Sequence, residues 1–357
     1  MEKNNAKKNL NWKFWAGLLI SALFLYLALK NVDFDKTVHS ILSADVSFLL
    51  LAVSITFIQF LMRAWRWKII LNPLKDTGFL NRFYSVLIGF AANCVLPARL
   101  GELIRANSLG QSEEMSKSSV FGTLVIERLF DAFALLLIII AGLMFSTMPG
   151  ELDFISENPV RTVFSIFAAI VLVAVFIKAF RSNTGIFIEI INRLLFMLSP
   201  GLRSKIADII EKFAGGFTPI KGPGAWTGVI TWSLLLWALS LCQIYCIELA
   251  TGIELPFTAL FILQSMAVLG VAVPSAPGYV GTFHLAVQHG FMFYGISNEE
   301  AFSAATLLHA SFFFPTILFG CTAFLIMQSG KERTGTDPVK KEILPATENN
   351  QGQTGEI

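Results

Sequence analysis

The feature that most constrains this chain is a series of long, uninterrupted apolar stretches. A helix needs about 20 mostly apolar residues to cross a bilayer. Over the 357 residues the mean hydropathy is +0.64, with 54% hydrophobic and only 15% charged residues, a composition outside the range of soluble domains. The sequence therefore predicts an all-α polytopic membrane protein with about six full spans, near residues 14–30, 47–62, 120–146, 160–180, 226–249 and 301–328.

Two further apolar stretches, 79–110 and 256–295, are each interrupted near the middle by proline, glycine and polar residues. Proline removes a backbone donor and disfavours helix just before it, and glycine admits close approach of another segment. Neither stretch fits one regular helix, so each is predicted to be a re-entrant or broken-helix hairpin. The residues expected to shape these hairpins are Asn93, Pro97, Gly101, Pro274, Pro277, Gly278 and Gly281.

The distribution of positive charge predicts the orientation. If residues 1–13 are cytoplasmic, 23 of the 27 Lys and Arg fall on the cytoplasmic side and three on the other. Both termini are then cytoplasmic, and the polar tail 329–357 is predicted to be disordered. Residues 186–213 have apolar side chains at helical spacing among basic ones, which predicts an amphipathic segment on the cytoplasmic interface.

This charge split holds only if each hairpin returns to the side from which it enters. The transmembrane domain 14–328 then divides into halves, about 14–146 and 160–328, with the same order of elements and opposite orientation. Such inverted repeats place a substrate site at the repeat interface in many transporters. The alternative is that counting helices has produced a false symmetry.

The first hairpin carries Arg99, Glu102 and Arg105 at spacings of three residues, which places them on neighbouring positions of one helix face. Two guanidinium groups around one carboxylate suit the binding of a phosphate ester. The next predicted span carries Glu127, Arg128 and Asp131, and charged groups inside a span must face the protein interior and pair. We expect these six residues to form one polar cavity for a lipid headgroup. Their formal charges sum to zero, so a purely structural ion-pair cluster is the alternative.

Other polar residues give weaker signals. His284 and Gln288 lie four residues apart on one face and form a possible polar site, although packing is the simpler explanation for each. The four cysteines, Cys94, Cys242, Cys246 and Cys321, lack the spacing of a metal or redox site. The sequence has no phosphate-binding loop and no metal-ligand cluster, so it predicts no metal, no cofactor and no nucleic-acid partner.

Three motifs in this order carry a resemblance to a known family: Asn93…Pro97-x-Arg99-x-Gly101-Glu102-x-x-Arg105, Glu127-Arg128-x-x-Asp131, and Pro274-x-x-Pro277-Gly278-x-x-Gly281. Together they resemble the membrane domain of the lysylphosphatidylglycerol synthase/flippase family, over about residues 12–328. The resemblance implies movement of an aminoacylated or glycosylated lipid across the bilayer. Full-length synthases add a cytoplasmic catalytic domain, which has no room after residue 328. Where many relatives have an acidic residue, this chain has His284, which leaves the headgroup open.

These observations favour a flippase-like translocase of a phospholipid or lipid-linked intermediate in the cytoplasmic membrane, with membrane lipids as partners. One alternative is a non-catalytic partner of a separately encoded lipid-modifying enzyme. A less favoured one is a membrane-embedded lipid-modifying transferase, because no activated nucleophile or donor site is evident. Without an ATP-binding motif, transport would be passive or coupled to an ion gradient. The oligomeric state stays open.

Overall fold

The computed structural model describes most of the chain, and the part it describes contains helices and no strand. The described residues are 17–30, 32–96, 99–145, 200–216, 222–273 and 275–333, with a few positions between 164 and 193 and residue 220. Much of the predicted span 160–180, the residues Pro97 and Pro274, and nearly all of 186–199 lie outside them.

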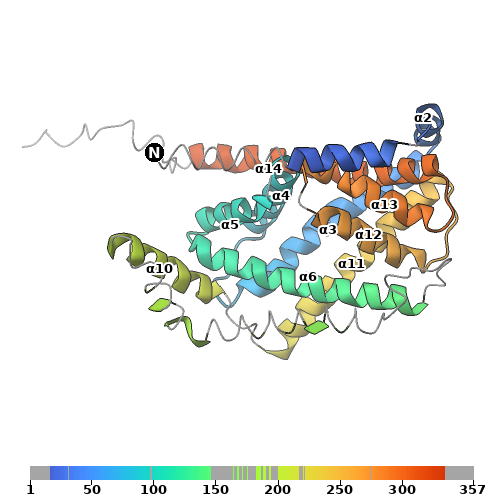
Figure 1. Cartoon of the computed structure of the whole chain (residues 1–357). Coiled ribbons are helices and arrows are strands. Elements are labelled where there is room, and N and C mark those ends of the chain that lie inside the picture. Colours follow the sequence, from blue (N-terminus) through green and yellow to red (C-terminus); the bar gives the residue numbers. More distant parts are fainter. Residues whose placement is uncertain are drawn as a thin grey trace, which may run out of the picture.

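Three described helices are long and apolar enough to cross a membrane: α3 (Val46–Leu71), α11 (Pro223–Thr251) and the Asn298–Ser329 part of α14 (Asn298–Arg333). A further long helix, α6, spans Lys117–Phe145. In Figure 1, α14 and α6 run along opposite sides of the molecule, and α3 and α11 cross between them. Many Leu, Phe and Ile side chains on these helices are exposed, as lipid contact requires. The chain is a helical membrane protein.

Two helix boundaries differ from the sequence prediction. Helix α3 does not end near residue 62 but continues to Leu71, so Arg63 and Arg66 lie inside a helix and not in a loop. Arginine is a good helix former, and inside the bundle Asp131 of α6 pairs with both guanidinium groups. Helix α14 runs on to Arg333, so the residues 329–333 are helical where a disordered tail was expected.

Both interrupted stretches form two helices with a break between them. The first hairpin is α4 (Phe79–Val95) and α5 (Gly101–Ser112). The second is α12 (Ala259–Ala272) and α13 (Thr282–Met292), with the 3₁₀ turn η2 (Pro277–Tyr279) in its break. Glycines allow the paired helices to touch: a Cβ at Gly101 would lie 2.0 Å from the Gly89 carbonyl oxygen, and one at Gly270 would lie 2.8 Å from the Phe283 Cα.

The order of a long helix, a hairpin and a long helix occurs twice, as α3 to α6 and as α11 to α14. The packing follows the same correspondence. Helix α4 packs on α14 while α12 packs on α6, α5 packs on α6 while α13 packs on α14, and α3 packs on α11. The two breaks also touch each other, because η2 contacts α4.

Smaller helices mark the two ends of the molecule. Helix Gly17–Leu29 is followed by α2 (Phe34–Leu42), and α10 (Pro200–Gly216) packs on α6. Glycines let α10 approach closely, since a Cβ at Gly216 would lie 2.2 Å from the Ser119 carbonyl oxygen. In Figure 1, α2 and α10 lie at opposite ends of the long helices.

Candidate functional site: a buried arginine and carboxylate cluster

The centre of the cluster is an ion pair between α5 and α6. Arg105 donates from both terminal nitrogens to the two carboxylate oxygens of Glu127, at 2.9 and 3.0 Å. The Arg105 guanidinium also lies over the Trp67 ring, 3.9 Å from its centroid. Arg105 is 1% exposed and Glu127 is fully buried. Both terminal nitrogens of the Arg105 guanidinium are bonded to Glu127, and the Trp67 ring covers its face. This pair therefore serves as a scaffold and has little surface left for a ligand.

Arg66 of α3 joins the cluster, and sequence reasoning missed it. Its guanidinium lies 2.5 Å from an Asp131 oxygen and 3.3 Å from a Glu127 oxygen, and it donates to the Ser233 hydroxyl at 2.9 Å. The predicted span near 47–62 ends before Arg66, because arginines after an apolar run resemble the end of a span. The available signal was the aromatic and aliphatic run that continues past them to Leu71.

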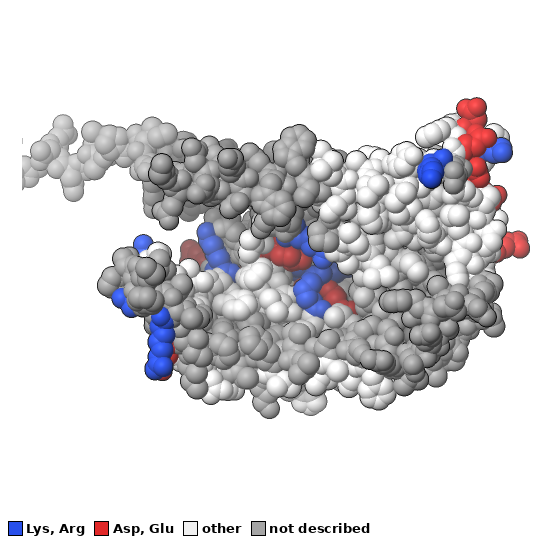
Figure 2. Space-filling view, in the orientation of Figure 1, with Lys and Arg blue, Asp and Glu red and all other residues white. Residues whose placement is uncertain are grey.

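Arg128 and Arg63 form the edge of the cluster. The Arg128 side chain is 44% exposed and reaches Glu127 at 2.8 Å, Asp131 at 3.4 Å and Glu102 at 3.8 Å. Arg63 lies 3.9 Å from Asp131. In the view of Figure 2, atoms of both charge signs lie in a hollow near the middle of the face, beside α6. The Glu102 Oε2 atom is buried and has no hydrogen-bond partner within the described residues.

The cluster is not electrically neutral, which corrects the zero sum expected from the sequence. Arginines contributed by α3 raise the positive count, so four arginines face three carboxylates: Arg63, Arg66, Arg105 and Arg128 against Glu102, Glu127 and Asp131. One positive charge remains, and the most exposed member is a guanidinium. A cluster with a surplus cation beside a hollow is suited to an anion.

Arg99 takes a different position from the other five predicted residues. It lies in the first break with a positive φ of 53°, is exposed, and donates to the Val271 carbonyl oxygen at the end of α12. Its guanidinium lies 5.9 Å from the centroid of the Tyr279 ring. No ion pair to Arg99 occurs in the part of the chain that the structure describes. Nearby, the Asn93 side-chain oxygen accepts a hydrogen bond from the Gly101 N–H at 2.8 Å, across the break.

The second break is held by neutral groups. The His309 ring contacts the Gly278 carbonyl oxygen through Nε2 at 2.8 Å. The Ser21 hydroxyl donates to the Val280 carbonyl at 2.6 Å and accepts from the Ala276 N–H at 3.0 Å. Pro277 begins η2, and both Gly278 and Gly281 have positive φ, which glycine adopts without strain.

His284 and Gln288 are buried in the bundle, at 7% and 1% exposure, and do not border the charged hollow. Gln288 donates to the Ala28 carbonyl and to Asn298, at 3.0 and 2.6 Å. The His284 ring packs 4.8 Å from the His309 ring, centroid to centroid. No hydrogen bond or ion pair joins either residue to the cluster within the described helices.

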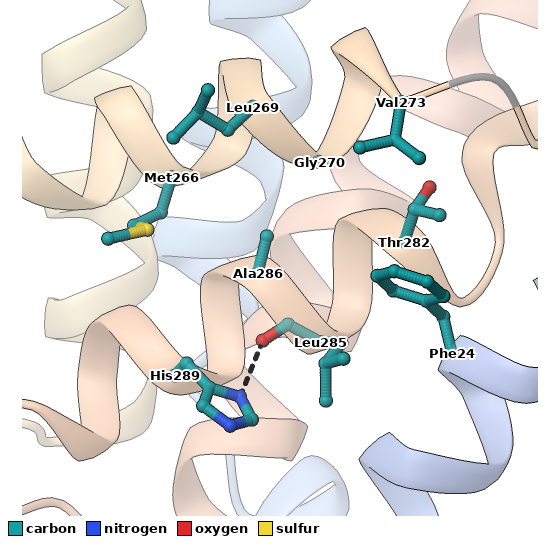
Figure 3. Close-up of a pocket in the computed structure, with 9 residues that line it drawn as sticks. All are labelled: Phe24, Met266, Leu269, Gly270, Val273, Thr282, Leu285, Ala286 and His289. Carbon is teal, nitrogen blue, oxygen red and sulfur yellow. Dashed lines mark hydrogen bonds between the residues drawn. The ribbon is translucent and has the colours of Figure 1, made fainter.

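A separate apolar pocket of about 210 Å³ lies between α12, α13 and the helix Gly17–Leu29. Figure 3 shows α12 on one side of it, α13 on the other and Phe24 approaching from the third helix. No sequence pattern predicts this pocket, because its walls come from distant segments: Phe24, Met266, Leu269, Gly270, Val273, Thr282, Leu285, Ala286 and His289. No group of three or more metal-ligating side chains occurs in the described ranges.

These features define a polytopic membrane protein in which two broken helix pairs meet beside a buried, positively charged ion cluster. Comparison with known families gives the next step. The model of the lysylphosphatidylglycerol synthase TM region matches residues 14–320, and the chain belongs to this family.

Relatives with the same extent occur in archaea. A UPF0104 membrane protein of Methanocaldococcus jannaschii is 24% identical over 87% of this chain and 94% of its own length. One of Pyrococcus horikoshii is 22% identical over 85% of this chain and 94% of its own length. The glycosyltransferase AglD of Haloferax volcanii is 25% identical over 83% of this chain, but the match covers only 51% of that protein. This chain therefore spans about half the length of that relative.

Proposed function

We propose that this protein translocates a phospholipid or a lipid-linked intermediate across the cytoplasmic membrane, and that the arginine and carboxylate cluster receives the phosphate of its headgroup. The observation that carries the proposal is the surplus positive charge of the cluster together with the 44% exposed guanidinium of Arg128. An unpaired charge at the centre of a span costs on the order of 3 kcal/mol or more. A bound anion would remove that cost, whereas a purely structural cluster needs no surplus charge.

Two other features support a lipid as the substrate. The apolar pocket between the second hairpin and the helix Gly17–Leu29 has apolar side chains against which an acyl chain can pack. The paired packing of α4 on α14 and of α12 on α6 is what an inverted repeat produces, and we propose that the two halves are related in this way. A site where two hairpins meet is accessible to either leaflet by small relative movements of the repeats.

The proposed orientation places both termini and α10 in the cytoplasm and α2 outside, as the charge distribution requires. Single cysteines on a cysteine-free background test it. A cysteine at Ser40 in α2 should react with a membrane-impermeant maleimide in intact cells, and one at Ser204 in α10 only after permeabilisation. The reverse pattern would contradict the orientation.

A second candidate function is that of a non-catalytic membrane partner for a separate lipid-modifying enzyme. The Haloferax relative supports it, because a protein named as a glycosyltransferase shares this region over about half its length. In that case the membrane domain would hold the lipid while another chain modifies it. Lipid movement by the purified protein alone distinguishes the two functions.

The test of translocation uses the purified protein in liposomes of phosphatidylcholine and phosphatidylglycerol with a trace of fluorescent phosphatidylglycerol. We expect label to move between leaflets, and Arg128→Lys to slow that movement about tenfold, equivalent to about 1.4 kcal/mol, because lysine keeps the charge but loses the bidentate fork. The matched control is Arg193→Lys, at an exposed arginine in a pair with Glu189. If correctly folded Arg128→Lys moves lipid as fast as the wild type, the headgroup role of the cluster is wrong.

A further inference from the structure

Arg99 adds a side-chain link between the two breaks. Its guanidinium donates to the carbonyl of Val271, in the last turn of α12, and lies beside the ring of Tyr279 in η2. Carbonyls in the last turn of a helix have no partner within that helix, and a cation is favourable there. Arg99 therefore closes the C-terminal end of α12 from the other hairpin.

Arg99 makes no ion pair within the described residues. The other arginines of the cluster are paired with carboxylates, while Arg99 has only a neutral carbonyl and the face of a ring. A guanidinium binds an anionic oxygen more strongly than a neutral one. An anion arriving beside Arg128 and Glu102 would thus compete well for Arg99, which stands three residues before Glu102 in the chain, just ahead of α5.

The backbone on both sides of the contact is strained. Arg99 has a φ of 53° and Tyr279 a φ of 61°, in the left-handed region that residues other than glycine rarely adopt. Such conformations persist where surrounding contacts hold them, and they concentrate at switch regions. Here each hairpin contributes one strained residue to the same contact, so loss of the contact allows both breaks to relax.

We propose that Arg99 is an anion-sensitive latch between the two hairpins. Without a ligand it holds the end of α12, and when a lipid phosphate binds at the cluster Arg99 leaves the Val271 carbonyl to bind it, which frees the ends of the hairpins to separate. This inference rests on the proposed function and adds to it a specific mechanism: headgroup binding and movement of the hairpins are coupled through one side chain.

Distances between spin labels test the latch. Labels are placed at Leu103 in α5 and Leu269 in α12, which are 53% and 56% exposed, after replacement of the native cysteines Cys94, Cys242, Cys246 and Cys321. The protein is reconstituted in nanodiscs of phosphatidylcholine alone or with one third phosphatidylglycerol. For the wild type we expect the distance distribution to shift to a longer or broader form when phosphatidylglycerol is present. Arg99→Ala should show the shifted form in phosphatidylcholine alone.

The matched control is Lys36→Ala, which removes an exposed positive charge from α2 and should leave the lipid-dependent shift intact. Phosphatidylglycerol retained by the protein is measured on the same samples by native mass spectrometry. If the wild type retains it but the distances do not change, or if Arg99→Ala matches the wild type in phosphatidylcholine, the latch is wrong while the proposed headgroup site stands. If the wild type retains no phosphatidylglycerol above the level of the Arg128→Lys variant, the headgroup site itself is wrong and the latch fails with it.

Discussion

The two hairpins have the same architecture, but one carries charged residues and the other carries none. Each consists of two helices that meet through glycine and are joined across a break by a side-chain hydrogen bond, from the Gly101 N–H to Asn93 in the first and from Thr282 to Ser275 in the second. The first hairpin, Phe79–Ser112, carries three arginines and a glutamate, whereas the second, Ala259–Met292, contains no Asp, Glu, Lys or Arg. The shape of a broken helix pair in this protein is therefore independent of charge.

This difference separates two roles. Two charges of the first hairpin, Arg105 and Glu102, have their partners on α6, namely Glu127 and Arg128, so its position depends on another helix through ion pairs. Apart from Arg99 at the Val271 carbonyl, the second hairpin is held by backbone carbonyls and neutral side chains, such as Ser21 and His309. We infer that the charged cluster beside the first hairpin supplies ligand recognition, whereas the second hairpin supplies closure. The predictions below test this division.

The largest effect is expected from Glu127→Gln. Glu127 is fully buried between Arg66 and Arg105, and a neutral amide would leave both guanidinium groups without their carboxylate. Removing one partner of a buried ion pair costs about 3–5 kcal/mol. The free energy of unfolding, measured in detergent with denaturant, should fall by that amount, and a matching drop in the melting temperature should accompany it.

The stability loss of Glu127→Gln is compared with that of Gln288→Leu in the second hairpin. Gln288 is as buried as Arg105, but it is neutral and donates to Ala28 and Asn298. Leaving those acceptors unsatisfied costs about 1–3 kcal/mol. Equal losses of stability for Glu127→Gln and Gln288→Leu would mean that charge does not distinguish the two hairpins energetically.

A loss of stability that is similar in the two hairpins is expected where their paired helices cross. Alanine at Gly101 would place Cβ 2.0 Å from a backbone oxygen, and alanine at Gly270 would place it 2.8 Å from a backbone Cα. Both changes force the paired helices apart at a cost of about 1–3 kcal/mol, with Gly101→Ala the larger because its contact is closer. Gly201→Ala in α10, where a Cβ meets nothing within 4 Å, is the control. Thermal unfolding that ranks Gly270→Ala above Gly101→Ala would contradict the packing described here.

The sequence predicted the breaks well because their cause is local. Proline and glycine interrupt a helix wherever they stand in an apolar stretch, so 79–110 and 256–295 were identified as broken without knowledge of their neighbours. The pairing of Arg128 with Asp131 was also accessible, since residues three apart on a helix are adjacent.

The full set of residues in the cluster could not be predicted from local sequence patterns. Arg66 meets Asp131 across 65 positions of sequence, and periodicity says nothing about contacts over that distance. The positive-inside rule pointed the other way, because it treats an arginine at the end of an apolar run as a loop residue. Because of this error the cluster was predicted to be neutral, whereas in the structure it has a surplus positive charge.

The smallest expected effect tests that surplus directly. Arg63 belongs to the edge of the cluster: its guanidinium lies 3.9 Å from Asp131 and over the Phe90 ring at 4.9 Å, without a closer ion pair among the described residues. The pair is long, so Arg63→Gln should cost less stability than Glu127→Gln, which breaks ion pairs at 2.9 and 3.3 Å. The substitution nevertheless makes the cluster formally neutral, with three arginines against three carboxylates. A unit charge about 8 Å from a ligand phosphate is worth roughly 0.5 kcal/mol in water, which is a twofold to threefold change in affinity.

We therefore expect Arg63→Gln to lower the preference for phosphatidylglycerol over phosphatidylcholine by that factor, measured by native mass spectrometry of protein from mixed nanodiscs. The change should shrink as salt is raised from 50 to 500 mM, because screening weakens the interaction of charges that water can reach. Lys36→Gln makes the same charge change on α2, at a side chain that is 73% exposed at the far end of the molecule, and should leave the preference unchanged. If both variants behave like the wild type, the surplus charge does not attract the headgroup, and recognition must come from the geometry of the Arg128 fork alone. If both lower the preference equally, only the net charge of the whole protein matters and the cluster has no special role.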